Sequence, residues 1–403
     1  MVKALLKPAP LTLAILLLLA VPAVVLQQPG NRLAQVLGVL VVLFCSGLLA
    51  FSAHELGHVV SGLLSGYRFV ALICGPLAVS RAGGRLQARW NDLWSLYPGA
   101  TMMAPSGARL PPIRDAVALY AGGPLTSLIL GVLLVSLYFG FHMDSVKWST
   151  IAAGTHSIAD KLLGDATFGV GLFSLAIAVA TMPPHALGGF LSDGAAVRML
   201  LKGGPEADRL RAINALMGQL FEGGRPRDWT PEFVEVAASL HDGSAVEDGA
   251  AGFAFLHAID RGDLSAARGH LARMEVASGN SPGLSQGALR VAVAWLAVAD
   301  GRIAEARVAF EQLEGTVVEE FSRQRVLAAI LLAEGKADEG MAAAHAGLTL
   351  IEQADQLFLG VTEMEREWLE QLAQGRLPTL LTSKEFDSLN RSLVLKSADS
   401  TLP

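Results

Sequence analysis

The sequence predicts an all-α polytopic membrane protein of about four transmembrane helices with a small β-hairpin, followed by a soluble domain of repeated helical hairpins. Three observations lead to this fold class. Long apolar segments fill the first half of the 403-residue chain, which is 52% hydrophobic overall. The charge balance changes near residue 202, from 13 Lys/Arg against 7 Asp/Glu before it to 18 against 30 after it. A glycine-centred pattern then repeats in the second half.

The boundary between the two halves lies near Lys202 to Pro205, where net charge and hydropathy change together. The two cysteines, Cys45 and Cys74, are too few for a disulfide framework and are predicted to be packing residues. We divide the chain into an N-terminal transmembrane helix (1–33), a membrane core (34–202), a helical linker (203–245), helical repeats (246–378) and a C-terminal tail (379–403).

The first apolar run, from Leu11 to Leu26, follows Lys3 and Lys7, a layout shared by signal peptides and first transmembrane helices. We favour a retained helix because the run exceeds the usual length of a signal-peptide core, but whether it is retained stays open. Three further spans are predicted at 34–64, at 116–141, and at 168–182 with a broken continuation to 201.

The loop between the second and third spans carries five arginines, Arg68, Arg81, Arg85, Arg89 and Arg109, whereas the loop from His142 to Asp165 carries Lys147 and Lys161 alone. Basic loops face the cytosol, so both termini are predicted to be cytosolic. We expect an integral multi-pass protein of a bacterial cell (inner) membrane.

The same loop contains two short apolar or alternating runs, Arg68 to Val79 and Arg85 to Trp90, separated by the turn sequence Ala82-Gly83-Gly84. This pattern predicts a β-hairpin. Met102 and Met103, further along the loop, together with Trp94 and Tyr97, are expected to be anchors at the membrane interface.

The second span ends in His54-Glu55-Leu-Gly-His58, which is the zinc-protease motif H-E-x-x-H inside a hydrophobic helix. Positions i and i+4 share one helix face, so both imidazoles can reach one metal while Glu55 reaches the metal's water. Glu55 is the sole glutamate before residue 203. The alternative is a set of buried polar residues satisfied by helix neighbours, but nothing structural requires these three together.

A tetrahedral zinc held by two histidines lacks one protein ligand if a position is kept for water. Asp193 is the candidate, because it follows a stretch whose prolines and glycines break the helix within the membrane. Counting from the basic residues at each cytosolic helix end, His58, Gly123 and Asp193 all lie about 10–15 Å inside that face. Two alternatives stay open: Asp193 caps the helix that restarts at Gly194, or His185 is the third ligand.

Three pieces of this sequence resemble the site-2 protease family of intramembrane zinc metalloproteases. They are His54 to His58, the glycine-rich Ala121-Gly-Gly-Pro124 and the Pro-rich approach to Asp193-Gly194. The resemblance implies that Asp193 is the third zinc ligand, and that membrane-associated strands pair with an unwound substrate. One departure is Ser127, where members often have Asn; its hydroxyl can still hydrogen-bond a substrate backbone.

The repeats of the second half are centred on Gly262, Gly301 and Gly335, spaced by 39 and 34 residues. Each copy is predicted to be helix, glycine turn, helix, and stacked copies bury one continuous core. The pattern resembles tetratricopeptide repeats in its turn-proximal part alone. Residues 353–374 are expected to cap the stack, and the tail from Ser397 is expected to be disordered.

Several function classes are not supported by the second half. Its histidines show no metal-ligand spacing and are interpreted as ordinary helix residues: His241, His257, His270 and His345. The chain has no phosphate-binding loop, no dinucleotide fingerprint after a strand and no basic stripe, so nucleic acid is not an expected partner. The acidic second half should be repelled by an anionic cytosolic leaflet.

We therefore expect an intramembrane zinc endopeptidase that cleaves a transmembrane or membrane-proximal segment of another membrane protein. His54, His58 and Asp193 are the expected zinc ligands and Glu55 is the expected catalytic base. The repeats are expected to dock the substrate or a regulatory protein. The alternative is a non-catalytic membrane receptor or scaffold that binds partners through its repeats, although an intact Glu55 argues against it.

Overall fold

The computed structural model describes residues 32–82, 85–91, 99–106, 109–149, 158–187, 190–278, 284–353 and 359–378. The predicted N-terminal helix lies almost entirely outside these residues, and the tail from residue 379 lies outside them completely. The described chain is mostly helical and divides into two compact units. The first comprises residues up to 187 with 191–207, and the second comprises 188–190 with the chain from 208 onward.

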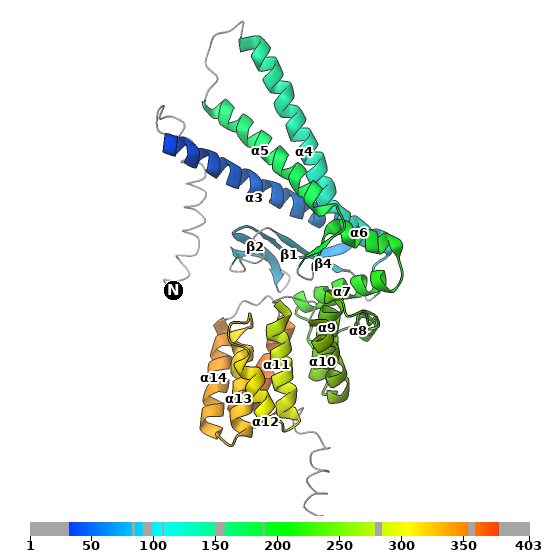
Figure 1. The fold of residues 1–403 in the computed structure, drawn as a ribbon, viewed down its shortest axis with the longest axis vertical. Coiled ribbons are helices and arrows are strands. Elements are labelled where there is room, and N and C mark those ends of the chain that lie inside the picture. Colours follow the sequence, from blue (N-terminus) through cyan, green and yellow to red (C-terminus); the bar gives the residue numbers. More distant parts are fainter. Residues whose placement is uncertain are drawn as a thin grey trace, which may run out of the picture. The chain divides into compact units, whose positions relative to one another are not determined.

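Three long helices form most of the first unit: α3 (Arg32–Leu64), α4 (Ile113–Ser149) and α5 (Ile158–Thr181) (Figure 1). All three are long and apolar enough to cross a membrane. Each also presents large apolar side chains outward, as Val39, Ile129 and Val179 show at 58%, 67% and 72% exposure. Such surfaces are suited to lipid.

The fourth predicted span does not continue as a single helix beyond Met182. After α5 come two short strands, β5 (Ala186–Leu187) and β6 (Phe190–Leu191), and then helix α6 (Asp193–Lys202). Prolines 183 and 184 explain the break, because proline lacks the amide hydrogen that would continue the helix. With 10 residues, α6 is about 15 Å long and cannot cross the hydrocarbon core by itself.

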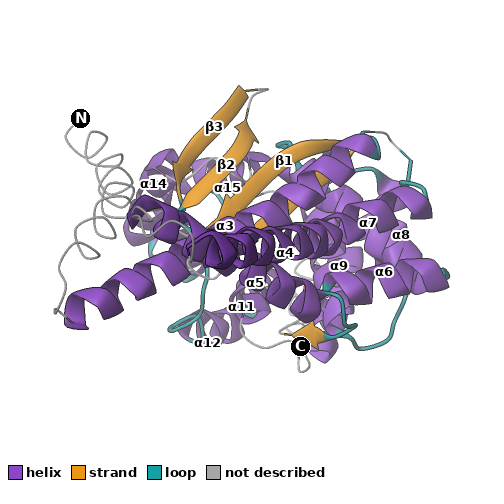
Figure 2. Cartoon of the chain, turned by 90° about the horizontal axis from the view of Figure 1, so that it is seen from above, coloured by secondary structure: helices purple, strands orange, loops and turns teal. Residues whose placement is uncertain are grey.

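The predicted hairpin is part of a larger antiparallel sheet of four strands in the order β3-β2-β1-β4. Figure 2 shows β3, β2 and β1 side by side. The predicted run from Arg68 to Val79 is divided into two strands by a tight turn at Gly75-Pro76. The strand β4 was not predicted from the sequence. The strands are β1 (Tyr67–Cys74), β2 (Leu77–Ala82), β3 (Arg85–Trp90) and β4 (Ala100–Pro105).

The prediction of Met102 and Met103 as interfacial anchors is wrong for Met103. This side chain lies in β4 and is buried in a small cluster with Tyr67 and Leu119. The sequence could not reveal this, because an apolar Met-Met pair is compatible with a strand as well as with the membrane interface. Trp94 and Tyr97 lie outside the described residues.

Helices α3 and α4 approach so closely that glycine is required at their contact. A Cβ atom on Gly57 would lie 2.5 Å from the carbonyl oxygen of Gly122, and one on Gly122 would lie 1.9 Å from Ser61 Oγ. Small residues at such a contact let two membrane helices approach backbone to backbone. The glycine-rich segment of α4 therefore packs directly on the turn of α3 that carries the H-E-x-x-H motif.

From residue 208 onward, the second unit contains the rest of α7 (Pro205–Phe221), a 3-10 turn η2 (Pro226–Asp228) and α8 (Pro231–Ala238). Each predicted glycine turn then joins two helices, with φ angles of 76°, 71° and 81° at Gly262, Gly301 and Gly335. The three pairs are α9 (Ala245–Asp260) with α10 (Leu264–Ser278), α11 (Leu284–Ala299) with α12 (Ile303–Glu311), and α13 (Glu320–Ala333) with α14 (Ala337–Gln353). Helix α15 (Leu359–Ala373) follows them.

One continuous apolar core runs through the helix pairs of the second unit. Helix α15 contributes Met364, Trp368 and Leu369 to it, in the region predicted to cap the stack. The segment predicted as a linker, 203–245, is also packed, since Trp229 and Phe233 are each 1% exposed.

Candidate metal centre

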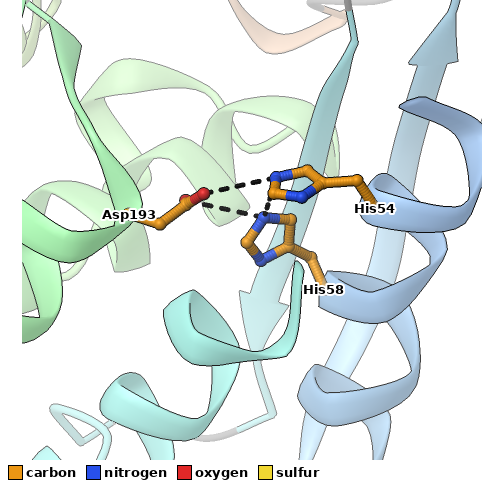
Figure 3. A group of neighbouring side chains, drawn as sticks. All are labelled: His54, His58 and Asp193. Carbon is orange, nitrogen blue, oxygen red and sulfur yellow. Dashed lines mark hydrogen bonds and ion pairs between the residues drawn. The ribbon is translucent and has the colours of Figure 1, made fainter. Parts of the chain in front are cut away.

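Two elements of the first unit bring three potential ligands together (Figure 3). Helix α3 places His54 and His58 one turn apart, with their Nε2 atoms 3.3 Å from each other. Asp193, at the start of α6, points a carboxylate at both rings: Oδ2 lies 3.3 Å from His54 Nε2 and Oδ1 lies 3.5 Å from His58 Nε2. Both histidines are buried, at 4% and 8% exposure.

These separations fit the donor set of a tetrahedral zinc site. Zinc binds imidazole nitrogen and carboxylate oxygen at about 2.0–2.2 Å, so ligand atoms at tetrahedral corners are about 3.3–3.5 Å apart. In the described part of the chain, His54, His58 and Asp193 form the group of His, Cys, Asp and Glu side chains that could hold a metal ion. Three protein ligands leave a fourth position open, as in catalytic zinc sites.

The second nitrogen of each imidazole is held by helix α4. His58 Nδ1 lies 2.8 Å from the carbonyl oxygen of Leu119, and His54 Nδ1 lies 3.0 Å from Ser127 Oγ. A carbonyl oxygen only accepts, so His58 must donate through Nδ1; in the neutral ring, Nε2 then carries the lone pair that faces Asp193 and could bind a metal. The Ser127 hydroxyl allows the same tautomer at His54.

The contact of Ser127 corrects the expectation that this hydroxyl is available to a substrate backbone. Ser127 is completely buried and lies against His54. The sequence shows Ser127 at a motif position but not its partner, because His54 lies 73 residues earlier in the chain.

Gly123 makes room for the His58 ring. A Cβ atom at this position would lie 2.2 Å from His58 Nε2, the atom that faces Asp193. Any side chain at residue 123 would therefore displace the imidazole from the site. This explains the second glycine of Ala121-Gly122-Gly123-Pro124.

The start of α6 holds Asp193 in place through its two sequence neighbours. Ser192, not Asp193, caps the helix: its Oγ accepts from the Ala195 amide at 3.2 Å and donates to the Pro183 carbonyl at 2.8 Å. Gly194 passes against the backbone of Met182, where a Cβ atom would lie 1.7 Å from the carbonyl oxygen. The Asp193 carboxylate is thereby free to face the histidines.

His185, the alternative third ligand, is placed differently. Its side chain is exposed and its Nδ1 lies 2.9 Å from the Pro183 carbonyl oxygen. The structure groups Asp193 with the two histidines and leaves His185 out of that group.

Glu55, the expected base, is 8% exposed and takes a hydrogen bond from Thr101 on β4. Sequence reasoning did not single out Thr101, and a single threonine in a loop carries no signal that could have identified it. The histidines of the second half take no part in the three-ligand group. His257, for example, lies with Nδ1 2.7 Å from the Pro226 carbonyl oxygen.

No family model matches this chain, and neither a curated protein nor a solved structure matches it. The class of this protein therefore has to be inferred from its own fold and candidate site. The described residues are largely helical, with three helices that could span a membrane and a His-His-Asp group, its two histidines buried, that could bind a metal.

Proposed function

We propose that this protein is an intramembrane zinc endopeptidase of the site-2 protease type. The observation that supports this most is the grouping of His54, His58 and Asp193 at the separations of tetrahedral ligands. The buried Glu55 directly follows His54 in the chain. The motif alone suggested two ligands and a base; the carboxylate from a distant helix completes the donor set.

The depth of the site supports a substrate within the membrane. His54 and His58 precede the end of α3 at Leu64 by ten and six residues, which corresponds to about 15 and 9 Å along the helix axis. Both positions lie inside the apolar stretch Val36–Leu64. A polypeptide that reaches these residues has to enter the same layer of the bilayer.

The chemistry follows from the groups present. His54, His58 and Asp193 would hold the zinc ion, which would supply a Lewis acid for the water and the scissile carbonyl. Glu55 takes a proton from the attacking water, whose oxygen forms the new bond to the carbonyl carbon. Glu55 then delivers that proton to the nitrogen as the C–N bond breaks. Leu119 and Ser127 keep the two imidazoles in the ligand orientation.

Strand β4 and the second unit have proposed roles in substrate handling. Among the described residues β4 pairs with β1 alone, so its other edge is suited to an extended peptide. A substrate in helical form hides its carbonyls and must be held while it unwinds. The stacked helix pairs of the second unit are a scaffold often used for docking, and we assign them the recruitment of the substrate or of a regulatory protein.

The decisive experiment replaces Glu55 by Gln in the full chain purified in detergent. Zinc content is measured by mass spectrometry, and cleavage is followed on β-casein, an unfolded protein, and on a synthetic single-span peptide in liposomes. We expect zinc to stay bound and hydrolysis to fall by roughly two to four orders of magnitude.

The matched control is Glu305→Gln, which changes an exposed glutamate of the second unit. It should retain both zinc and activity. Cleavage by Glu55→Gln at the parent rate would remove Glu55 from the mechanism. A parent protein that binds no zinc, or that cleaves neither probe, would contradict the proposed function and favour a non-catalytic scaffold.

A further inference from the structure

Strand β4 contacts Glu55 through a threonine hydroxyl. Thr101 Oγ1 lies 2.6 Å from Glu55 Oε2 and 3.1 Å from the backbone carbonyl oxygen of Glu55. A buried carboxylate is costly unless it is hydrogen-bonded, so this contact compensates part of the desolvation of Glu55.

The second carboxylate oxygen of Glu55 lies close to Gly99, the residue before β4. A Cβ atom on Gly99 would lie 2.6 Å from Glu55 Oε1, and Gly99 has a φ of +145°, which side-chain-bearing residues rarely adopt. The absence of a side chain at Gly99 therefore leaves the space that the carboxylate occupies. One oxygen receives a hydrogen bond and the other lies against bare backbone.

The strand that carries Thr101 is fixed on two sides. Thr101 is paired with Leu72 of β1 in the sheet. Two residues further on, Met103 packs on α3 so closely that a Cβ atom on Gly62 would lie 2.8 Å from its Cε. Residues two apart in a strand share one face, so Thr101 and Met103 both face α3. The hydroxyl is thus held at a defined place relative to Glu55.

We propose that Thr101 is the positioning residue of the catalytic base, an inference that rests on the proposed function. Its hydroxyl holds the Glu55 carboxylate in one rotamer, so that the base meets the attacking water without having to be ordered during the reaction. The Thr101 hydroxyl acts on the reaction through Glu55, which it contacts at both the carboxylate and the backbone carbonyl.

A hydroxyl suits this role because it both donates and accepts. While Glu55 is ionised, Thr101 donates its proton to Oε2. Once Glu55 has taken the proton of the water, it can donate to Thr101 Oγ1, whose own proton turns to the Glu55 carbonyl oxygen. The same contact then persists in both stages of proton transfer, with every proton accounted for.

The test compares Thr101→Val, which keeps the shape and removes the hydroxyl, with Thr101→Ser, which keeps the hydroxyl. In the full chain acting on β-casein, Thr101→Val should lower kcat by roughly 10- to 100-fold, the range for loss of a hydrogen bond to a charged group. KM and zinc content should not change. Thr101→Ser should recover most of the lost activity.

The matched control is Thr181→Val, because the buried Thr181 hydroxyl has no hydrogen-bond partner among the described residues. It should leave kcat unchanged. Thr101→Val that acts at the parent rate, or Thr101→Ser that fails to rescue, overturns the positioning role while the proposed function stands. A parent that does not cleave overturns both.

A second readout does not depend on activity. The infrared band of the Glu55 carboxyl group is obtained as the difference between the parent and Glu55→Gln spectra. The same difference is then recorded in the Thr101→Val and Thr101→Ser backgrounds. We expect the band to shift in the Val background and to stay in place in the Ser background. A band that does not move in the Val background shows that the contact is absent in solution and overturns the proposal.

Discussion

In the first unit, the buried and half-buried ionisable side chains of the site gather at one point, whereas buried and half-buried arginines of the second unit lie beside carboxylates. His54, His58 and Asp193 face one another, and Glu55 is hydrogen-bonded to a neutral hydroxyl. No lysine or arginine of the described residues forms an ion pair with Asp193. In the second unit the corresponding pairs are Arg209 with Asp242, Arg225 with Asp260, Arg273 with Glu247 and Arg325 with Glu365.

This difference distinguishes charged side chains that pair with each other from charged side chains that are available to a ligand. A buried pair of opposite charges balances itself and needs no further ligand. His54, His58 and Asp193 instead face one another without a lysine or arginine partner among the described residues, in a group that could bind a metal ion. The second unit therefore balances the charges of these pairs internally, whereas the first unit contains a group of side chains that could bind a cation.

The largest expected effect comes from removing one of the converging groups. Asp193→Ala should abolish stable zinc binding and, with it, hydrolysis, because two imidazoles alone hold zinc weakly. His185→Ala should retain zinc, since the His185 side chain is exposed and contacts the Pro183 carbonyl instead. Metal content of both purified variants is the measurement. Zinc loss in His185→Ala but not in Asp193→Ala would transfer the ligand role to His185.

The pair of Arg325 and Glu365 tests the other side of the comparison. Both side chains are buried, and the guanidinium lies 4.0 Å from the centre of the Trp295 ring. Glu365→Leu leaves the arginine unpaired and should lower the free energy of unfolding by about 3–5 kcal/mol. The double variant Arg325→Met with Glu365→Leu should recover most of this loss.

Denaturant unfolding of the full chain in detergent, followed by tryptophan fluorescence, measures these differences. Glu305→Ala is the control, because the pair of Arg302 and Glu305 is exposed and such pairs contribute about 0–1 kcal/mol. A double variant as unstable as the single one would mean that the buried pair contributes more than charge balance.

The smallest expected effect is a pH dependence at the pair of Arg209 and Asp242. Hydrogen bonds from the Arg209 guanidinium hold the pKa of Asp242 below its usual range. The folded-state pKa is below the unfolded value of about 3.9, so the contribution to stability is full above that value and is lost as pH falls through the folded pKa. Asp242→Asn should therefore cost about 1 kcal/mol near pH 7 and progressively less below pH 4.

Unfolding midpoints of the parent and Asp242→Asn between pH 7 and pH 3 check this. A difference that grows as the pH falls would have the wrong sign for a lowered pKa.

Much of the local organisation was predictable because it depends on residues that are close in sequence. The spacing of His54 and His58 places both on one face of a helix, and the structure has both rings on one side of α3. Three of the four predicted apolar spans coincide with the long helices α3, α4 and α5, and the first lies outside the described residues. The glycines of the repeats lie between paired helices, where their positive φ angles form the turns.

The partners of these residues could not be predicted, because they are distant in sequence. Ser127 was expected near the substrate and lies on His54; Thr101 was not singled out and lies on Glu55. Strand β4 was missed because its six residues show no alternation that distinguishes a strand from an interfacial segment.

The sequence by itself determined which side chains were candidates for the site: two histidines and a glutamate at helical spacing, and a carboxylate after a broken helix. The tertiary structure decided which of them meet. Asp193 faces the histidines while His185 faces a backbone carbonyl, although both follow the same Pro-Pro break. The reason is that Ser192 and Gly194 set the start of α6 against the end of α5, and this packing aims Asp193 at the site.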